Sequence, residues 1–192
     1  MLFKDPKQPR KLIALCGAPR AGKTTAQAYL QLRYGVEMVD DAAPLREFAM
    51  SSLGLSRYHV AHPKGKETEV VLPGGRKLRV RDVLGRLGNA IEDIAGPDSI
   101  PEMAIHAATW SDPSGLKAYS FGSVRREQAR VYKRYGAKVI EITRPGMEVV
   151  NEYDQYDRSL VDLTIANDST VAVLNNRLEF HLGPWLSEGL HI

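Results

Sequence analysis

The chain has 192 residues, of which 43% are hydrophobic and 26% charged, with a formal net charge of +3 at pH 7. These values are typical of one soluble globular domain that buries a core without disulfide bonds, and a single cysteine excludes an internal disulfide framework and a cysteine-rich zinc site. Cys16 is the only cysteine, no run approaches the roughly 20 apolar residues that cross a bilayer, and the first residues lack a signal-peptide core. We therefore expect a cytoplasmic protein that has no membrane partner.

The first expected elements are a strand and a helix. The apolar run at 11–16 is typical of a buried parallel strand, and after Lys23 the apolar residues take helical spacing. Cys16 ends the apolar run, so we expect a small buried side chain there rather than a reactive thiol. Residues 36–39 then predict a second strand, and residues 43–53 predict a helix with a proline in its first turn.

The middle of the chain breaks this regularity. Residues 55–79 have no clear apolar period and contain two prolines and a Gly-Gly pair, so we expect a flap or lid-like insertion at about 55–79 rather than core. From Val80 to Ile94 the apolar residues form one stripe at helical spacing, and Arg81 and Arg86 lie off that stripe. A further helix is expected at about 100–110.

The last third of the chain alternates again. Strands are expected at 118–121, 137–142 and 160–165, with helices at 124–135 and 170–182. Strands that alternate with helices indicate a parallel sheet with helices on both faces. With no internal repeat and no second-domain linker, we expect a single α/β domain over residues 1–192.

A phosphate-binding motif connects the first strand to the first helix. Residues 17–24 read Gly-Ala-Pro-Arg-Ala-Gly-Lys-Thr and match the Walker A pattern G-x-x-x-x-G-K-[ST]. Such a match arises by chance in about one chain in a hundred of this size, and the strand-to-helix context makes it more specific. The expected fold is therefore a three-layer P-loop NTPase fold with a parallel sheet, helices on both faces and a lid-like insertion.

The motif assigns roles toward ATP and Mg²⁺. Backbone N–H groups of the loop and of the helix N-terminus bind phosphate oxygens. We expect Lys23 to reach the β- and γ-phosphates and the Thr24 hydroxyl to ligate Mg²⁺. The expected ATP-binding residues of the loop are Gly17, Ala18, Pro19, Arg20, Ala21, Gly22, Lys23, Thr24 and Thr25.

The remaining charges and histidines narrow the class. Basic residues gather at 64–86 and 125–134, as two solvated faces or as two walls around a polyphosphate. The first of these segments has no aromatic residue, which disfavours nucleic acid as a partner. No Asn-Lys-x-Asp motif and no apolar strand ending in Asp-Glu is present, so a small-molecule kinase is favoured over a GTPase or a motor ATPase. The histidines have no metal-ligand spacing and are expected to be structural or exposed: His59, His62, His106, His181 and His191.

Several weaker motifs follow the loop in order. They are Ala43-Pro-Leu-Arg, the helix at 79–88, Ser123-Val-Arg125, Arg144-Pro-Gly146 and Asp-Leu-Thr-Ile-Ala-Asn-Asp-Ser at 162–169. In this order the chain resembles the bacteriophage deoxynucleoside monophosphate kinases, small P-loop enzymes of the adenylate-kinase kind. The resemblance implies that Mg²⁺-bound ATP donates its γ-phosphoryl group to a deoxynucleoside monophosphate and forms the diphosphate. It also implies that the insertion is a lid or monophosphate-binding excursion.

The resemblance also implies site residues outside the loop. Arg46, Arg81 and Arg86 would hold the acceptor phosphate, Arg125 would act with Lys23 as a catalytic residue on the transferred group, and Asn167 would lie near adenine. Each arginine has a surface position as its plain alternative, and Asn167 has capping of the last helix. An anionic acceptor needs no general base, so positive charge is the main requirement.

Two departures from the family keep other functions open. Ala43 and Ser123 stand where the family has aspartates. Asp40, as a metal ligand, and Asp41, at the acceptor, could supply a carboxylate instead, or form only a polar strand end. The alternatives are a dephospho-coenzyme A kinase-like enzyme, whose hydroxyl acceptor needs a carboxylate base, and a non-catalytic pseudo-kinase. A homodimer is also left open.

Overall fold

The computed structural model describes residues 11–188 apart from 111, 113, 150 and 151. The chain forms two compact units, Met1–Asp40 with Pro101–Ile192, and Asp41–Ile100. The expected insertion at 55–79 lies inside the second unit, which is wider than that segment. No helix within the described ranges is long and apolar enough to span a bilayer.

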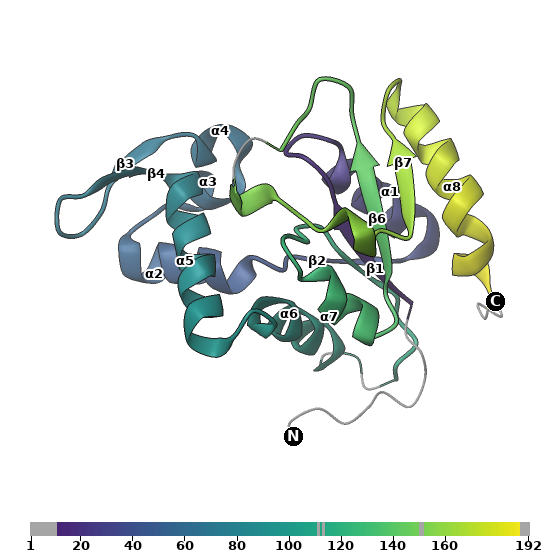
Figure 1. Cartoon of the computed structure of the whole chain (residues 1–192), viewed down its shortest axis with the longest axis horizontal. Helices are drawn as coiled ribbons and strands as arrows, with labels where there is room; N and C mark the ends of the chain where they lie inside the picture. The colour runs from purple at the N-terminus through teal and green to yellow at the C-terminus, as the bar shows by residue number, and fades with distance from the viewer. Residues whose placement is uncertain (1–10, 111, 113, 150–151, 189–192) are drawn as a thin grey trace. The chain divides into compact units, whose positions relative to one another are not determined.

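The first unit is built on a sheet whose described strands are all parallel (Figure 1). Its strands lie in the order β2-β5-β1-β6-β7. The central strand, β1, is buried at every residue, which explains why the sequence of this strand is an uninterrupted apolar run. The strands are β1 (Leu12–Cys16), β2 (Glu37–Val39), β5 (Tyr119–Phe121), β6 (Lys138–Thr143) and β7 (Leu163–Ala166).

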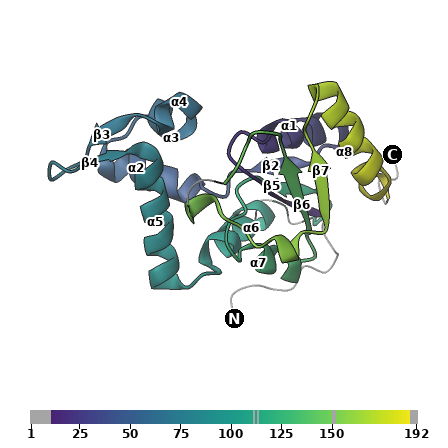
Figure 2. The ribbon, with the colours of Figure 1, turned by 45° about the horizontal axis from the view of Figure 1, so that its top comes forward.

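Helices cover both faces of this sheet (Figure 2). Ile13 and Leu15 of β1 belong to a core shared with α1 (Lys23–Tyr34) and α8 (Val171–Ser187). The alternate residues of β1 belong to a core shared with α6 (Ser99–Trp110) and α7 (Ala129–Arg134). Because successive residues of a strand point to opposite faces, β1 contributes to both cores. The predicted three-layer α/β fold is confirmed.

Three expected boundaries in the first unit are wrong. The helix expected at 124–135 is only α7, because residues 124–128 instead form a loop in which Arg126 has φ 45° and bridges Tyr156. The strand expected at 160–165 begins at Leu163, since the 3₁₀ turn η2 (Arg158–Leu160) precedes it. The last helix continues past residue 182 to Ser187, with Pro184 inside it.

The second unit has its own small core. It contains α2 (Ala43–Leu53), α3 (Arg57–Ala61), α4 (Pro63–Lys66), the antiparallel hairpin β3 (Glu69–Val71) and β4 (Lys77–Arg79), and α5 (Val80–Ala95). Leu55 and Val60 are buried with residues of α2 and α5, so the expectation that 55–79 contributes no core is wrong. Helices of five and four residues are too short for a period to be visible in the sequence.

The long helix α5 has a shorter apolar contact face than its stripe suggests. Val80 and Val83 are buried, whereas Ile94, near the other end, is 87% exposed. Gly88 is buried, and a Cβ there would lie 3.6 Å from Leu45 Cδ1 of α2. The buried residues of α5 therefore lie between Val80 and Gly88.

Candidate functional site

The phosphate-loop motif lies in the structural context that it requires. Strand β1 ends at Cys16 and helix α1 begins at Lys23, so the motif is the connection between them. Gly17 has φ 133°, and a Cβ there would lie 2.3 Å from the Ile142 carbonyl oxygen. Gly22 has φ 112°, and a Cβ there would lie 2.4 Å from Asn167 Nδ2. Both positions therefore require glycine for backbone conformation and for space.

The N-terminus of α1 is open to a ligand. Gly22 occupies the cap position, no side chain caps the helix and its first turn contains no acidic residue. The first N–H groups of a helix have no partner within the helix, and the helix dipole places partial positive charge there. An anion is the natural ligand of such an end.

Lys23 brings a full positive charge to this end. Its Nζ donates to the carbonyl oxygens of Gly17, at 2.6 Å, and Ala18, at 3.0 Å. These bonds hold the ammonium group across the loop. A phosphate oxygen is a stronger acceptor than a neutral carbonyl, because a bond between two ions is charge-assisted.

A pocket of about 280 Å³ adjoins the loop. Among the described residues that line it, the charged side chains are all cations, those of Arg20, Lys23 and Arg144, and none is a carboxylate. Arg20 has φ 65°, a left-handed conformation that is uncommon outside glycine and clusters at ligand sites. The other lining residues are Gly22, Thr24, Thr25, Asn167, Ser169 and Val171. The pocket is therefore suited to a polyanion.

Asn167 supports the loop from the end of β7. Its Nδ2 donates to the Ala21 carbonyl oxygen at 2.8 Å, its backbone N–H donates to the Thr143 carbonyl oxygen at 2.7 Å, and the residue is 9% exposed. The cap of α8 is Thr170, which accepts from the Val173 N–H, so a capping function for Asn167 is wrong. The expected adenine contact stays a prediction.

Arg144 is the pocket residue whose role the sequence did not reveal. It follows β6 directly, and β6 is the parallel neighbour of β1. Because the carboxyl ends of parallel strands share one edge of the sheet, a residue after β6 lies beside the loop after β1. Ser169 and Val171 reach the pocket for the same reason, since they follow β7.

The expected catalytic Arg125 is not among the residues that line this pocket. It lies in the loop after β5, where its Nη2 is 3.7 Å from Asp154 Oδ1. Its backbone N–H donates to Gln128 Oε1 at 3.1 Å. The charge of Arg125 is thus paired with a carboxylate whose side chain is only 12% exposed.

A buried carboxylate lies behind the phosphate loop. Glu141 of β6 is 6% exposed and is the register partner of Cys16. It accepts hydrogen bonds from Tyr156 Oη and, at 2.9 Å, from Thr164 Oγ1, and its Oε1 lies 3.1 Å from Arg158 Nε. These partners compensate the cost of burying its charge. In the sequence its signal is an isolated Glu within an otherwise apolar strand, and no motif includes it.

Cys16 is buried, as expected. Burial, and then the nearby Glu141 carboxylate, raise the pKa of the Cys16 thiol to about 12. A thiol with this pKa holds almost no thiolate at neutral pH and is a poor nucleophile.

The expected acceptor residues belong to the second unit. Arg81 donates from Nε and Nη2 to Glu67 Oε1, at 3.0 and 2.7 Å. Arg86 is exposed on α5, and Arg46 is half-buried on α2. Asp41 is 5% exposed at the start of this unit. Any anion that binds Arg81 therefore competes with Glu67.

Metal ligands are sparse in the described part of the chain. Asp40 is exposed and follows β2 in the first unit. The described residues contain no group of three or more His, Cys, Asp or Glu side chains placed to hold a metal. The described histidines make contacts with residues close to them in the sequence. His59 and His62 cap short helices, and His106 and His181 contact aromatic rings. His191 lies outside the described residues.

Comparison with known proteins gives structural likenesses only. No family model and no curated protein matches the chain. Dephospho-CoA kinase from Campylobacter jejuni matches with 14% identity over 90% of this chain and 98% of that chain, at a TM-score of 0.49. Shikimate kinase from Aquifex aeolicus (12%; 93% and 99%; 0.45) and APS kinase from Mycobacterium tuberculosis (16%; 92% and 99%; 0.42) also match. At these values the likenesses carry no argument, and the function proposed below depends on this chain's own residues.

Proposed function

We propose that the protein is an ATP-dependent kinase that transfers the γ-phosphoryl group to a nucleoside or deoxynucleoside monophosphate. The observation that carries this proposal is the pocket at the phosphate loop. It combines an uncapped helix N-terminus, three cationic side chains and no carboxylate. This set of groups favours a polyphosphate over any neutral ligand.

The donor half of the site follows from the loop. The N–H groups at the start of α1 would bind phosphate oxygens, and Lys23 would exchange its two carbonyl acceptors for the β- and γ-phosphates. Asn167 would keep the loop in its binding shape through its bond to Ala21. Arg144 would add positive charge where the pocket opens beside β6.

The residues at the loop fit Mg²⁺ bound together with ATP. Mg²⁺ keeps several water ligands and needs only one or two protein oxygens beside substrate phosphates, so a preformed carboxylate cage is not required. Thr24 is exposed and lines the pocket, which leaves its hydroxyl available as a ligand. When bound, the ion would neutralise charge on the transferring phosphates.

The acceptor half rests on the arginines. A monophosphate acceptor is anionic at neutral pH, so the protein has to neutralise charge rather than remove a proton. Arginine matches phosphate better than lysine because it donates two parallel hydrogen bonds. Arg81 already donates from Nε and Nη2 to a single carboxylate oxygen, Glu67 Oε1, and we infer that the acceptor phosphate replaces this carboxylate. The expected lid-like function of the segment 55–79 stays a prediction.

The Arg81–Glu67 pair also sustains a second candidate. If Glu67 remains bound to Arg81, this arginine does not bind an acceptor phosphate. A hydroxyl group is then the favoured acceptor, as in a dephospho-coenzyme A kinase-like reaction. A hydroxyl acceptor needs a carboxylate base. Asp40, exposed after β2, and Asp41 are the two carboxylates that could supply it.

Phosphoryl transfer itself is tested first. Purified protein is assayed with Mg²⁺ and ATP against a panel of deoxynucleoside monophosphates, nucleoside monophosphates and dephospho-coenzyme A. Lys23→Ala should abolish turnover with every acceptor, since removing one clamp on developing charge commonly costs about 100-fold or more. Lys117→Ala, at an exposed lysine that precedes β5 and lies outside both basic segments, is the matched control. Turnover of Lys23→Ala within tenfold of the wild type would refute the proposal.

The acceptor class is tested with three further variants. For a monophosphate acceptor, Arg81→Ala should raise the KM for the monophosphate much more than that for ATP, and Glu67→Gln should lower it by releasing Arg81. For a hydroxyl acceptor, Asp41→Asn should be the damaging change and Arg81→Ala should have little effect. Unaltered monophosphate kinetics in Arg81→Ala would contradict the monophosphate assignment.

A further inference from the structure

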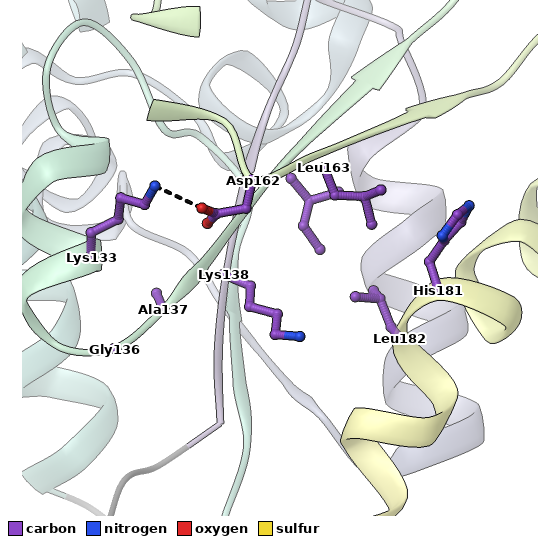
Figure 3. Close-up of a pocket in the computed structure, with 9 residues that line it drawn as sticks. Lys133, Gly136, Ala137, Lys138, Asp162, Leu163, His181 and Leu182 are labelled. Atoms are coloured by element: carbon purple, nitrogen blue, oxygen red, sulfur yellow. Dashed lines mark ion pairs between the residues drawn. The ribbon is translucent and has the colours of Figure 1, made fainter. Parts of the chain in front are cut away.

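Figure 3 shows a second pocket, of about 400 Å³. It adjoins the starts of β6 and β7, whereas the phosphate loop follows the end of the parallel strand β1, so the two sites lie at opposite ends of the strands. The second pocket is lined by the residues that begin β6 and β7, by the turn before β6, and by α8. Strand β6 runs from Lys138 at this pocket to Thr143 beside the loop, five residue steps or about 17 Å. A molecule that fits this pocket therefore does not reach the nucleotide site.

The floor of the pocket is apolar. Ile140 and Leu182 are almost fully buried beneath it, and Leu163 and Ala137 continue the apolar surface. Its volume lies within the range of sites for small molecules, about 300–1,000 Å³. A ligand here would bury a hydrocarbon or aromatic part against this floor.

The charged groups of the pocket leave an excess of positive charge. Among the described residues that line it, Asp162 is the only carboxylate, and both of its oxygens are used: Oδ1 lies 2.7 Å from Lys133 Nζ, and Oδ2 accepts from the Val139 N–H at 2.8 Å. Within the described part of the chain, Lys138 makes no ion pair with an acidic side chain. Its Nζ lies 4.5 Å from the centre of the Trp185 ring, a contact that leaves its charge available.

Lys138 and His181 approach the pocket from different elements. Figure 3 shows the Lys138 side chain extending from β6 toward α8, where His181 and Leu182 lie on the facing side. An ammonium group and an imidazole above an apolar floor can bind a negative group while the floor contacts the rest of the molecule. We propose that this pocket is a binding site for a small organic anion, separate from the phosphate loop.

The test is a residue-resolved titration of the full-length protein by ¹H–¹⁵N NMR. Benzoate is the probe, because it joins one negative charge to one flat apolar ring. Benzamide supplies the ring without the charge, and acetate supplies the charge without a large apolar part. Benzoate should shift the amide signals of Gly136 and Leu182 saturably. The Kd from these shifts should be several-fold lower for benzoate than for benzamide or acetate.

Variants then assign the charge. Lys138→Met keeps the length of the side chain over Trp185 and removes the ammonium group, so it should raise the Kd for benzoate about tenfold, the size of one lost charge-assisted hydrogen bond. His181→Gln should raise the Kd for benzoate by a smaller factor. It is a second, independent variant that tests the proposal even if Lys138→Met does not fold. Lys77→Met on β4 is the control and should bind as the wild type does.

Any of four results would overturn the proposal. Three of them are an absence of saturable shifts at Gly136 and Leu182, shifts confined to the phosphate-loop amides of Gly22 and Lys23, and benzoate affinity that neither Lys138→Met nor His181→Gln changes. Equal affinity for benzamide and benzoate would also overturn it, because the excess positive charge would then have no effect.

Discussion

Asn167 connects the end of β7 to the phosphate loop, and removing its side chain should damage both stability and nucleotide affinity. In Asn167→Ala the 2.8 Å bond to the Ala21 carbonyl oxygen is lost, and Ala21 is itself 0% exposed. A buried acceptor left without its donor costs about 1–3 kcal/mol. Because Asn167 lines the pocket, a water molecule can reach part of this space, so we expect about 1–2 kcal/mol, toward the lower half of that range.

The same change should loosen the loop that binds ATP. The Ala21 carbonyl lies in the middle of the loop, next to Gly22, whose left-handed conformation starts α1. If about 1.4 kcal/mol of loop preorganisation is lost, the affinity for ATP falls about tenfold. Asn167→Asp should be worse at neutral pH, because a carboxylate cannot donate to the carbonyl and adds negative charge to an anion site.

Urea unfolding and initial rates at varied ATP concentration measure the two effects. Asn176→Ala is the matched control, since Asn176 is an exposed asparagine on α8. The expected order of ATP affinity is wild type equal to Asn176→Ala, then Asn167→Ala, then Asn167→Asp. If Asn167→Ala unfolds at the same urea concentration as Asn176→Ala and has the same KM for ATP, Asn167 does not support the loop.

Three shorter predictions concern residues around the loop. Gly22→Ala should destabilise the protein by about 2 kcal/mol or more, because φ is 112° and the new Cβ would lie 2.4 Å from Asn167 Nδ2. The loss of stability should be smaller when the same change is made in Asn167→Ala. If the losses from the two single changes simply add up in the double variant, this contact does not cause the cost. Burial raises the pKa of the Cys16 thiol to about 12. Cys16 should therefore resist alkylation by iodoacetamide at pH 8 until urea unfolds the protein. Equal labelling of the folded and unfolded protein, measured by mass spectrometry, would show that the thiol is accessible. Burial, and then the hydrogen bond to Glu141, raise the pKa of Tyr156 from 10.0 to about 12. The contribution of Tyr156 to stability is therefore fully present below pH 10 and is lost as the pH rises toward 12. Urea titrations between pH 10 and 12 should show a free energy of unfolding that depends less on pH in Tyr156→Phe than in the wild type, and an unchanged dependence would contradict the cause given for the shift.

The sequence by itself determined the strand–loop–helix unit at the phosphate site and the parallel sheet around it. These features are visible locally, because burial on both faces gives β1 an uninterrupted apolar run, and the loop needs glycine at Gly17 and Gly22 wherever it occurs. The alternation of strands and helices then requires parallel pairing. The sequence pattern also placed α2 at its observed bounds.

The tertiary structure alone decided which distant side chains meet. Arg144 and Asn167 reach the loop because β6 and β7 end at the same sheet edge as β1, and no local pattern encodes that strand order. Glu141 obtains its partners, Tyr156 and Arg158, from a segment that has no periodicity. Arg81 lay correctly off the apolar stripe of its helix, but its pairing with Glu67, 14 positions earlier, depends on how the hairpin folds back onto α5. Periodicity reports which face of an element is buried, whereas contacts between elements depend on the order in which the elements pack.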